Sequence, residues 1–426
     1  MAVMENNTKN NNGKKLFSTE GILPKILLFL SIAGPGIITA TVDNDAGGIT
    51  TYSLAGSNFG YALLWIMIPT LILLIIVQEM SARLGAVTGK GLADLIRENF
   101  SIKLTFLIMA LLVVVNIANT ISEFAGIAAA SELFGVSRFI AVPLAGFFVW
   151  WFVLKSNYKS VEKVLLASCL FYFAYVIAAF LAHPDWSVVA KETITPAFKF
   201  EKSYVIMIIG IIGTTIAPWM QFYMQSSIVE KGITKERFSF LRIDVIIGCI
   251  VSVIIAFFII LTTAATIHKA GISINTVKDA ALALLPLAGK YAEYLFAFGL
   301  LNASLFAASI LPLSTAYSVS EAFGWESGIN RKYKEAKHFY ILYTSMILLG
   351  MIFVLIPSFS LITLMYFSQV LNGLLLPFII IFMLVLINKS NLMGKFKNPM
   401  WYNIITWVSA ILIIIAALVL VGVSLF

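Results

Sequence analysis

The chain has 426 residues, of which 60% are hydrophobic and only 12% are charged, and its mean hydropathy is +0.96. This composition is typical of a polytopic membrane protein and excludes a pair of soluble domains. The formal charge of +8 does not indicate a nucleic-acid partner, because the basic residues gather in the segments that separate apolar runs.

Eleven apolar segments follow a polar tail (1–23) that is rich in Asn and Lys and that we expect to be disordered. Each segment is long enough to cross a bilayer, for which about 20 residues suffice. Both cysteines, Cys169 and Cys249, lie within apolar segments, so no disulfide framework is predicted. The predicted spans lie near 24–56, 59–78, 104–133, 138–154, 161–182, 203–229, 243–267, 291–320, 339–356, 360–387 and 401–425.

The distribution of basic residues predicts the orientation of these spans. With the N-terminus in the cytoplasm, most of the 29 Lys and Arg residues fall on the inner side, as the positive-inside rule requires. An odd number of spans then places the C-terminus outside the cell. We expect a multi-pass protein of the plasma membrane, and the heavy use of Asn, Lys and Ile is typical of a bacterial chain.

The first span is interrupted by the sequence Thr-Val-Asp-Asn-Asp-Ala-Gly-Gly at 41–48. A charged side chain at mid-membrane costs several kcal/mol or more, so it persists where it faces a cavity, a partner or an ion. Adjacent glycines weaken a helix by roughly 1 kcal/mol each, and unwound backbone at this depth must line a cavity or be buried in protein. Asp43 and Asp45 beside freed carbonyls therefore predict a cation site.

The sixth span carries a second interruption at 210–219, where Pro218 removes a helical hydrogen bond near Thr214. Five spans separate the two breaks, so the second set of five would be inverted relative to the first. Interrupted helices at matching positions of two halves indicate a secondary transporter whose site lies between them. We predict a first repeat over 24–182, a second over 203–387, and a loop with an eleventh span over 388–426.

Several motifs resemble the Nramp family of divalent-metal transporters. The first span contains Gly-Pro-Gly at 34–36, Asp-Ala-Gly-Gly at 45–48 and Ala-Gly-Ser-Asn-Phe-Gly-Tyr at 55–61. Arg-Leu-Gly-Ala-Val-Thr-Gly-Lys follows at 83–90, and Ser-Gln-Val, Leu-Pro-Phe and Leu-Met-Gly begin at 368, 376 and 392. The resemblance implies the LeuT-type five-plus-five fold, with broken first and sixth helices, and inward movement of Mn²⁺ and Fe²⁺ with protons.

The predicted metal site departs from the family's pattern. The family's Asp is kept as Asp45, but its metal-binding Asn becomes Gly48 and its sixth-span Met becomes Ala217. The family's tenth-span Gln falls on Leu375, and Asn372 is the nearest stand-in. We also expect the carbonyl of Thr214, three residues before Ala217, to contact the ion. The predicted metal-site residues are therefore Asp45, Thr214, Gly48, Ala217, Asp43 and Asn372.

Loss of the thioether changes the expected ion. Sulfur is a soft ligand that favours transition metals, whereas Mg²⁺ prefers oxygen and usually keeps several of its waters. The pattern therefore resembles the Nramp-related magnesium transporter branch, and we expect a largely hydrated Mg²⁺, with Mn²⁺ also transported. No resident cofactor is predicted, and the expected partners are the ion and the bilayer, with the protein a monomer or weak oligomer.

Proton coupling is expected to be weak or absent. The family uses histidines in the sixth span as proton relays, but Trp219 and Gln225 stand there in this chain. In the third span the family's Asp is replaced by Thr120, and only Glu123 remains. Glu123 and Trp219 are the candidate coupling or gating residues. Entry would be driven by the membrane potential, worth about 4–5 kcal/mol for a divalent ion at 100 mV.

Structural roles remain open for the same residues. Asp43 could contact the ion, face a vestibule or cap a helix, and Asn44 could stabilise a turn. Glu123 could be a structural partner, Gly48 purely conformational, and Ala217 a small packing residue.

Three other functions remain as alternatives. A proton-coupled Mn²⁺/Fe²⁺ importer would need a soft ligand from Met220 or Met224 in a shifted register. A sodium-coupled amino-acid or amine transporter would share the fold, but paired carboxylates disfavour an anionic substrate. The paired breaks favour alternating access over a fixed channel, and the absence of catalytic motifs argues against an enzyme.

Overall fold

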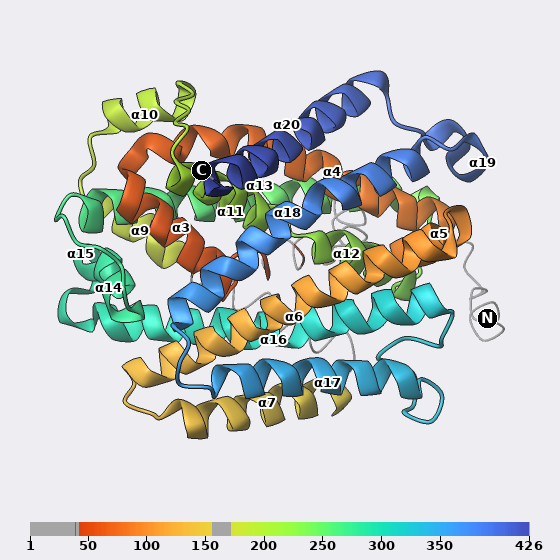
Figure 1. Cartoon of the computed structure of the whole chain (residues 1–426), viewed down its shortest axis with the longest axis horizontal. Helices are drawn as coiled ribbons and strands as arrows, with labels where there is room; N and C mark the ends of the chain where they lie inside the picture. Colours follow the sequence, from red (N-terminus) through yellow and green to blue (C-terminus); the bar gives the residue numbers. More distant parts are fainter. Residues whose placement is uncertain (1–38, 40–41, 156–171, 426) are drawn as a thin grey trace, which may run out of the picture.

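The computed structural model describes residues 39, 42–155 and 172–425, and within them all regular structure is helical (Figure 1). Nine helical stretches in these residues are long and apolar enough to cross a membrane. Short helices lie at the two ends of the bundle, with α5 and α19 at one end and α10, α14 and α15 at the other (Figure 1). The prediction of an all-α polytopic membrane protein is therefore confirmed.

The first half of the described chain begins at the break in the first span. About half of the first predicted span and half of the fifth lie outside the described residues. The helices are α3 (Ala46–Phe59), the 3₁₀ segment η1 (Gly60–Ile66), α4 (Met67–Thr88), α5 (Leu92–Asn99), α6 (Ile102–Leu133), α7 (Arg138–Lys155), α9 (Phe173–Leu181) and α10 (Trp186–Ile194).

The second half holds the remaining spans and several short connecting helices. They are α11 (Lys202–Thr215), α12 (Pro218–Glu230), η3 (Lys235–Arg237), α13 (Phe238–Thr263), the π-helical η4 (Ala264–His268), α14 (Val277–Ala281), η5 (Leu282–Leu284), α15 (Leu285–Ala288), η6 (Gly289–Tyr291), α16 (Ala292–Phe323), α17 (Lys337–Val354), α18 (Leu361–Ile387), α19 (Ser390–Met393), η7 (Gly394–Phe396) and α20 (Met400–Leu425).

The second span is longer than predicted. We expected it to end near residue 78, but α4 continues to Thr88 and ends at Gly89 in the left-handed conformation, at φ 66°. The extra turns carry a buried ion pair between Glu79 and Arg83, 3.1 Å apart. Because the two charges lie one helical turn apart and neutralise each other, the helix stays buried where hydropathy alone predicts a loop.

Both predicted breaks are present. In the sixth span, α11 ends at Thr215, Ile216 and Ala217 leave the helical conformation, and α12 begins with Pro218 in its first turn. Proline is favoured there because the first turn has no partner for its missing N–H. In the first span, the turn at 43–45 precedes α3, whose N-cap is Asp45.

Glycines allow α11 and α18 to cross closely beside the breaks. A Cβ added to Gly213 would lie 2.1 Å from the carbonyl oxygen of Gln369 and 2.3 Å from the amide nitrogen of Gly373. A Cβ added to Gly373 would lie 2.3 Å from the carbonyl oxygen of Ile209. This crossing brings the Gln369 turn of α18 to the level of the two breaks.

Candidate functional site

Asp45 is fixed by the start of α3. Its Oδ1 accepts a hydrogen bond from the backbone N–H of Gly48 at 2.7 Å, the usual geometry of an N-cap carboxylate. The side chain is buried, with 4% of the residue exposed. The helix N-terminus favours negative charge at this position, so the sequence places an ionised or ion-binding group where the backbone supports it.

Three oxygen atoms from both broken helices meet at Gly48. A Cβ added there would lie 2.6 Å from the carbonyl oxygen of Asp43, 3.2 Å from Thr214 Oγ1 and 3.4 Å from Asp45 Oδ1. Thr214 Oγ1 is buried and has no hydrogen-bond partner among the described residues. We predicted the carbonyl of Thr214 as a ligand, whereas the group at Gly48 is its hydroxyl. Gly48 is the residue whose missing side chain leaves these oxygens facing one another.

Ala217 lies at the start of α12 and presents only a methyl group. Its carbonyl accepts the N–H of Met220 at 3.1 Å. When the Gln221 side-chain amide is oriented so that its nitrogen faces acceptors, this nitrogen donates to the Ala217 carbonyl at 2.7 Å. Gln221 therefore stabilises the break from within α12, a role that nothing in the motif pattern indicated.

Glu123 reaches the first break from α6. Its Oε2 accepts a hydrogen bond from the N–H of Ala46 at 3.3 Å, and its Oε1 is buried without a hydrogen-bond partner among the described residues. Glu123 therefore lies at the predicted site, and its hydrogen bond to Ala46 links the third span to the first break.

Asp43 presents two different groups in two directions. Its carbonyl oxygen faces Gly48, but its side-chain Oδ2 accepts a hydrogen bond from Ser252 Oγ of α13 at 2.7 Å. Asn44 donates to the same Oγ at 3.1 Å. The Asp43 side chain is therefore held at α13 and not among the oxygens at Gly48, a direction that the sequence did not indicate.

Asn372 contacts other amides. Its side chain exchanges hydrogen bonds with Asn119 of α6, at 2.9 and 3.0 Å, and donates to Gln369 Oε1 at 2.7 Å. Gln369 is the residue that touches the break, because a Cβ added to Gly47 would lie 1.8 Å from its Nε2. Sequence reasoning missed Gln369, although it lies in the Ser-Gln-Val motif of the resemblance.

Trp219 and the two methionines of α12 are all buried. The Trp219 carbonyl accepts a hydrogen bond from Ser314 Oγ of α16 at 3.1 Å, and its ring lies 6.3 Å from that of Tyr223. Met220 and Met224 lie in the first two turns of α12, with Ala217 as the N-cap. α12 begins at Pro218, so both methionines lie within the helix and Ala217 lies directly before it.

No group of three or more His, Cys, Asp or Glu side chains in the described residues is spaced to hold a metal ion. An ion at the breaks would therefore take most of its ligands from carbonyls, hydroxyls, amides and water. These are hard oxygen ligands of the kind that suit Mg²⁺, Ca²⁺ and Mn²⁺.

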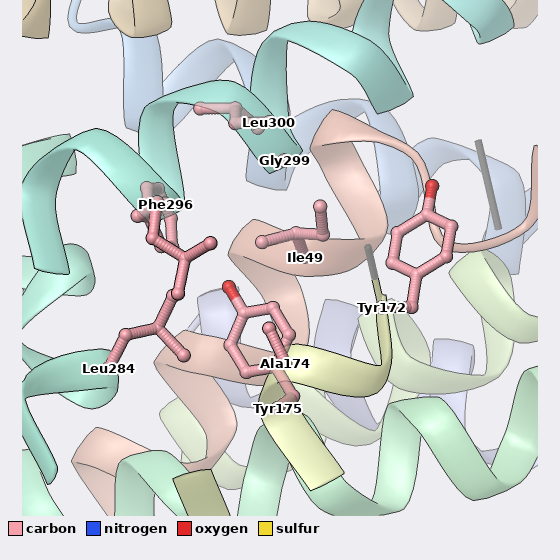
Figure 2. A pocket seen from close by; sticks show the side chains of 9 residues that line it. Ile49, Tyr172, Ala174, Tyr175, Leu284, Phe296, Gly299 and Leu300 are labelled. Carbon is pink, nitrogen blue, oxygen red and sulfur yellow. The ribbon is translucent and has the colours of Figure 1, made fainter. Parts of the chain in front are cut away.

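A narrow apolar pocket lies one residue beyond Gly48, around Ile49. Figure 2 shows Ile49 near the centre of the pocket, with Tyr172 on one side and Phe296 of α16 on the other. The free space is about 10 Å³, close to the minimum for one water. The pocket is therefore too small to hold a hydrated ion.

Most of the sequence matches the profile of a known family. The profile described as Nramp, natural resistance-associated macrophage protein-like, covers residues 36–422. The chain belongs to the Nramp family. The family consists of membrane transporters, so the protein is not classed with enzymes.

Named relatives of this Nramp chain include bacterial proteins. It is 28% identical over 414 residues to the divalent metal cation transporter MntH of Bacillus subtilis (strain 168), covering 94% of this chain and 92% of the relative. It is 29% identical over 302 residues to MntH of Yersinia pestis (strain Pestoides F), covering 69% and 73%.

Solved structures show the same fold. The manganese transporter of Eremococcus coleocola superposes with a TM-score of 0.79 at 23% identity, covering 93% of this chain and 87% of that one. MhsT in complex with L-phenylalanine superposes with a TM-score of 0.58 at 15% identity, covering 90% of this chain and 98% of that one. The predicted LeuT-type architecture is therefore confirmed.

Proposed function

We propose that this Nramp protein imports divalent metal cations by alternating access, with the ion held at the two breaks. The observation that carries the proposal is the meeting of the Asp43 carbonyl, Thr214 Oγ1 and Asp45 Oδ1 at Gly48. One charged oxygen, one carbonyl and one hydroxyl from both broken helices form part of a cation shell. Family membership and the names of the relatives, divalent metal cation transporters, support a metal ion as the cargo.

The preferred ion in this proposal is Mg²⁺ with part of its water shell. Ala217 supplies no sulfur where the family has a thioether, and Gly48 supplies no side chain where the family has an amide. Mg²⁺ sheds water reluctantly and is usually bound through few protein oxygens. The side chains of Gln369 and Asn372 add further amide groups close to the break, and these could hydrogen-bond to waters of the ion.

Weak or absent proton coupling follows from the groups around Glu123. One turn before Glu123 on α6, Asn119 pairs with Asn372. About one turn further back, Asn116 donates to Thr315 Oγ1 of α16 at 2.9 Å. These amides and hydroxyls do not titrate near neutral pH. The carboxyl group of Glu123 is therefore not continued by a chain of titratable groups along this path, and the membrane potential would supply the driving force.

A proton-coupled Mn²⁺ importer is the second candidate. It is favoured by the buried carboxyl group of Glu123, which contacts the start of α3 beside Asp45 and has one oxygen without a hydrogen-bond partner among the described residues. It is also favoured by the manganese transporter of Eremococcus coleocola, whose fold this chain shares.

Uptake by purified protein in liposomes separates the two candidates. We expect both Mg²⁺ and Mn²⁺ to enter, with Mg²⁺ entry persisting when external Mn²⁺ is absent. Asp45→Ala should abolish entry, whereas Glu192→Ala, on α10 away from the breaks, should leave it unchanged. Saturable Mn²⁺ entry with no Mg²⁺ entry would reject the magnesium proposal and favour the second candidate.

A further inference from the structure

A groove lies at the end of the bundle where α13 begins, next to the turn before α20. It encloses about 560 Å³, and its lining includes Lys235, Phe238, Ser239, Arg242, Ile246 and Phe396. We propose that this groove binds the headgroup of an anionic phospholipid, with an acyl chain lying along α13. The proposal does not depend on which ion the protein transports.

The rim of the groove is basic. Lys235 is exposed and makes no ion pair with the described residues. The side chain of Arg242 is 48% exposed, and its nearest carboxylate, Glu79, is 3.9 Å away. The one acidic lining residue, Glu236, accepts a hydrogen bond from Thr234 Oγ1 in its own turn. Lys235 can therefore contact an anion freely, and the half-exposed guanidinium of Arg242 can do so beside its contacts with Glu79 and Tyr402.

The wall of the groove continues into an apolar stripe. Ile243, which also lines the groove, is 49% exposed, and Ile247 and Ile254 further along α13 are 42% and 45% exposed. Their spacing of four and seven residues places them on one face of the helix. An acyl chain that starts below Arg242 would lie along this face.

This combination favours a lipid over a soluble anion. The basic residues stand at the end of a membrane-crossing helix, where lipid headgroups lie, and basic pockets between such helices bind anionic headgroups. A free phosphate would use the rim only, whereas a phospholipid would also cover the exposed isoleucines. Ser239 adds a hydroxyl donor between the two basic residues along the first turns of α13.

The groove is linked to the Arg-Leu-Gly motif of α4. Arg242 donates to the Tyr402 hydroxyl of α20 at 3.2 Å and approaches Glu79, which pairs with Arg83. Arg83 donates in turn to the carbonyl of Phe396, a lining residue, at 3.1 Å. A bound headgroup would therefore stabilise the packing of α4, α13 and α20.

Native mass spectrometry and thermal unfolding of the purified protein test the proposal, with phosphatidylglycerol and phosphatidylcholine titrated separately. We expect one phosphatidylglycerol to be retained preferentially and to raise the midpoint of unfolding. Lys235→Gln should weaken its binding about five-fold, the usual effect of one basic residue near an anionic lipid. Lys337→Gln, an exposed lysine of α17, should leave binding unchanged, and Arg242→Lys should retain most of it.

Three results would overturn the proposal. The first is equal retention of the two lipids by the unmodified protein. The second is phosphatidylglycerol binding by Lys235→Gln as tight as by the unmodified protein. The third is an equal rise in the unfolding midpoint with glycerol phosphate, which would assign the groove to a soluble anion.

Discussion

The side-chain amide of Gln369 lies directly against the backbone of Gly47, where a Cβ would come within 1.8 Å of its Nε2. This contact joins the tenth span to the break of the first span, between Asp45 and Gly48. A side chain at position 47 would clash with Gln369 of α18, so the packing of this neighbouring helix, and not only the local backbone, favours glycine there.

Gly47→Ala should lower transport and destabilise the protein by about 1–3 kcal/mol, the usual cost of overpacking. Gln369→Ala removes the group that an alanine at 47 would meet. The double variant should therefore be more stable to thermal unfolding than Gly47→Ala alone. If the second substitution does not restore any stability, the Gly47–Gln369 contact is not the cause of the loss.

The hydrogen bonds between Asn119 and Asn372 should make the stability effects of substituting these two residues non-additive. Asn372→Leu leaves both atoms of the buried Asn119 amide without their partner and should cost about 1–3 kcal/mol. Asn119→Leu combined with Asn372→Leu removes both amides, and should cost less than the sum of the single changes. Strict additivity in thermal unfolding would contradict the paired arrangement.

The side chain of Arg83 links the second span to the turn before α20 by hydrogen bonds. Its guanidinium donates to the carbonyls of Phe396 and Lys397, at 3.1 and 3.2 Å, and to the side chain of Asn398. Arg83→Lys keeps the charge but cannot make this planar set of bonds. We expect a loss of about 2–4 kcal/mol, measured by thermal unfolding, whereas Lys90→Arg on the exposed turn should have little effect.

Ala217→Met tests the reason for the ion preference. A thioether at the start of α12 should raise Mn²⁺ uptake relative to Mg²⁺ on the order of ten-fold, because soft ligands favour transition metals. Uptake of each ion in liposomes measures the ratio, and Ala217→Leu controls for side-chain size. An equal change in both variants would show that volume, not sulfur, sets the preference.

The two breaks could be predicted because their signals are local. Carboxylates, paired glycines and Pro218 within apolar runs each disturb a helix whatever surrounds them. Glu123 could be singled out for the same reason, as a carboxyl group in an otherwise apolar span.

The contacts of the site could not be predicted from local signals. Gln369 reaches Gly47 only because Gly213 and Gly373 let α11 and α18 cross closely. The direction of the Asp43 side chain depends on Ser252, which lies 209 residues away in the chain. The Thr214 hydroxyl lies close to Gly48 only because the two breaks meet in the folded chain, and they are about 170 residues apart in the sequence.

The most direct test of the proposed mechanism follows Mg²⁺ uptake and internal pH in the same liposomes under an inside-negative potential. Mg²⁺ entry that grows with the potential, without acidification and lost in Asp45→Ala, is the result that we predict. Mg²⁺ entry that acidifies the interior in proportion to uptake would contradict uncoupled transport, and absence of Mg²⁺ entry would contradict the proposed ion.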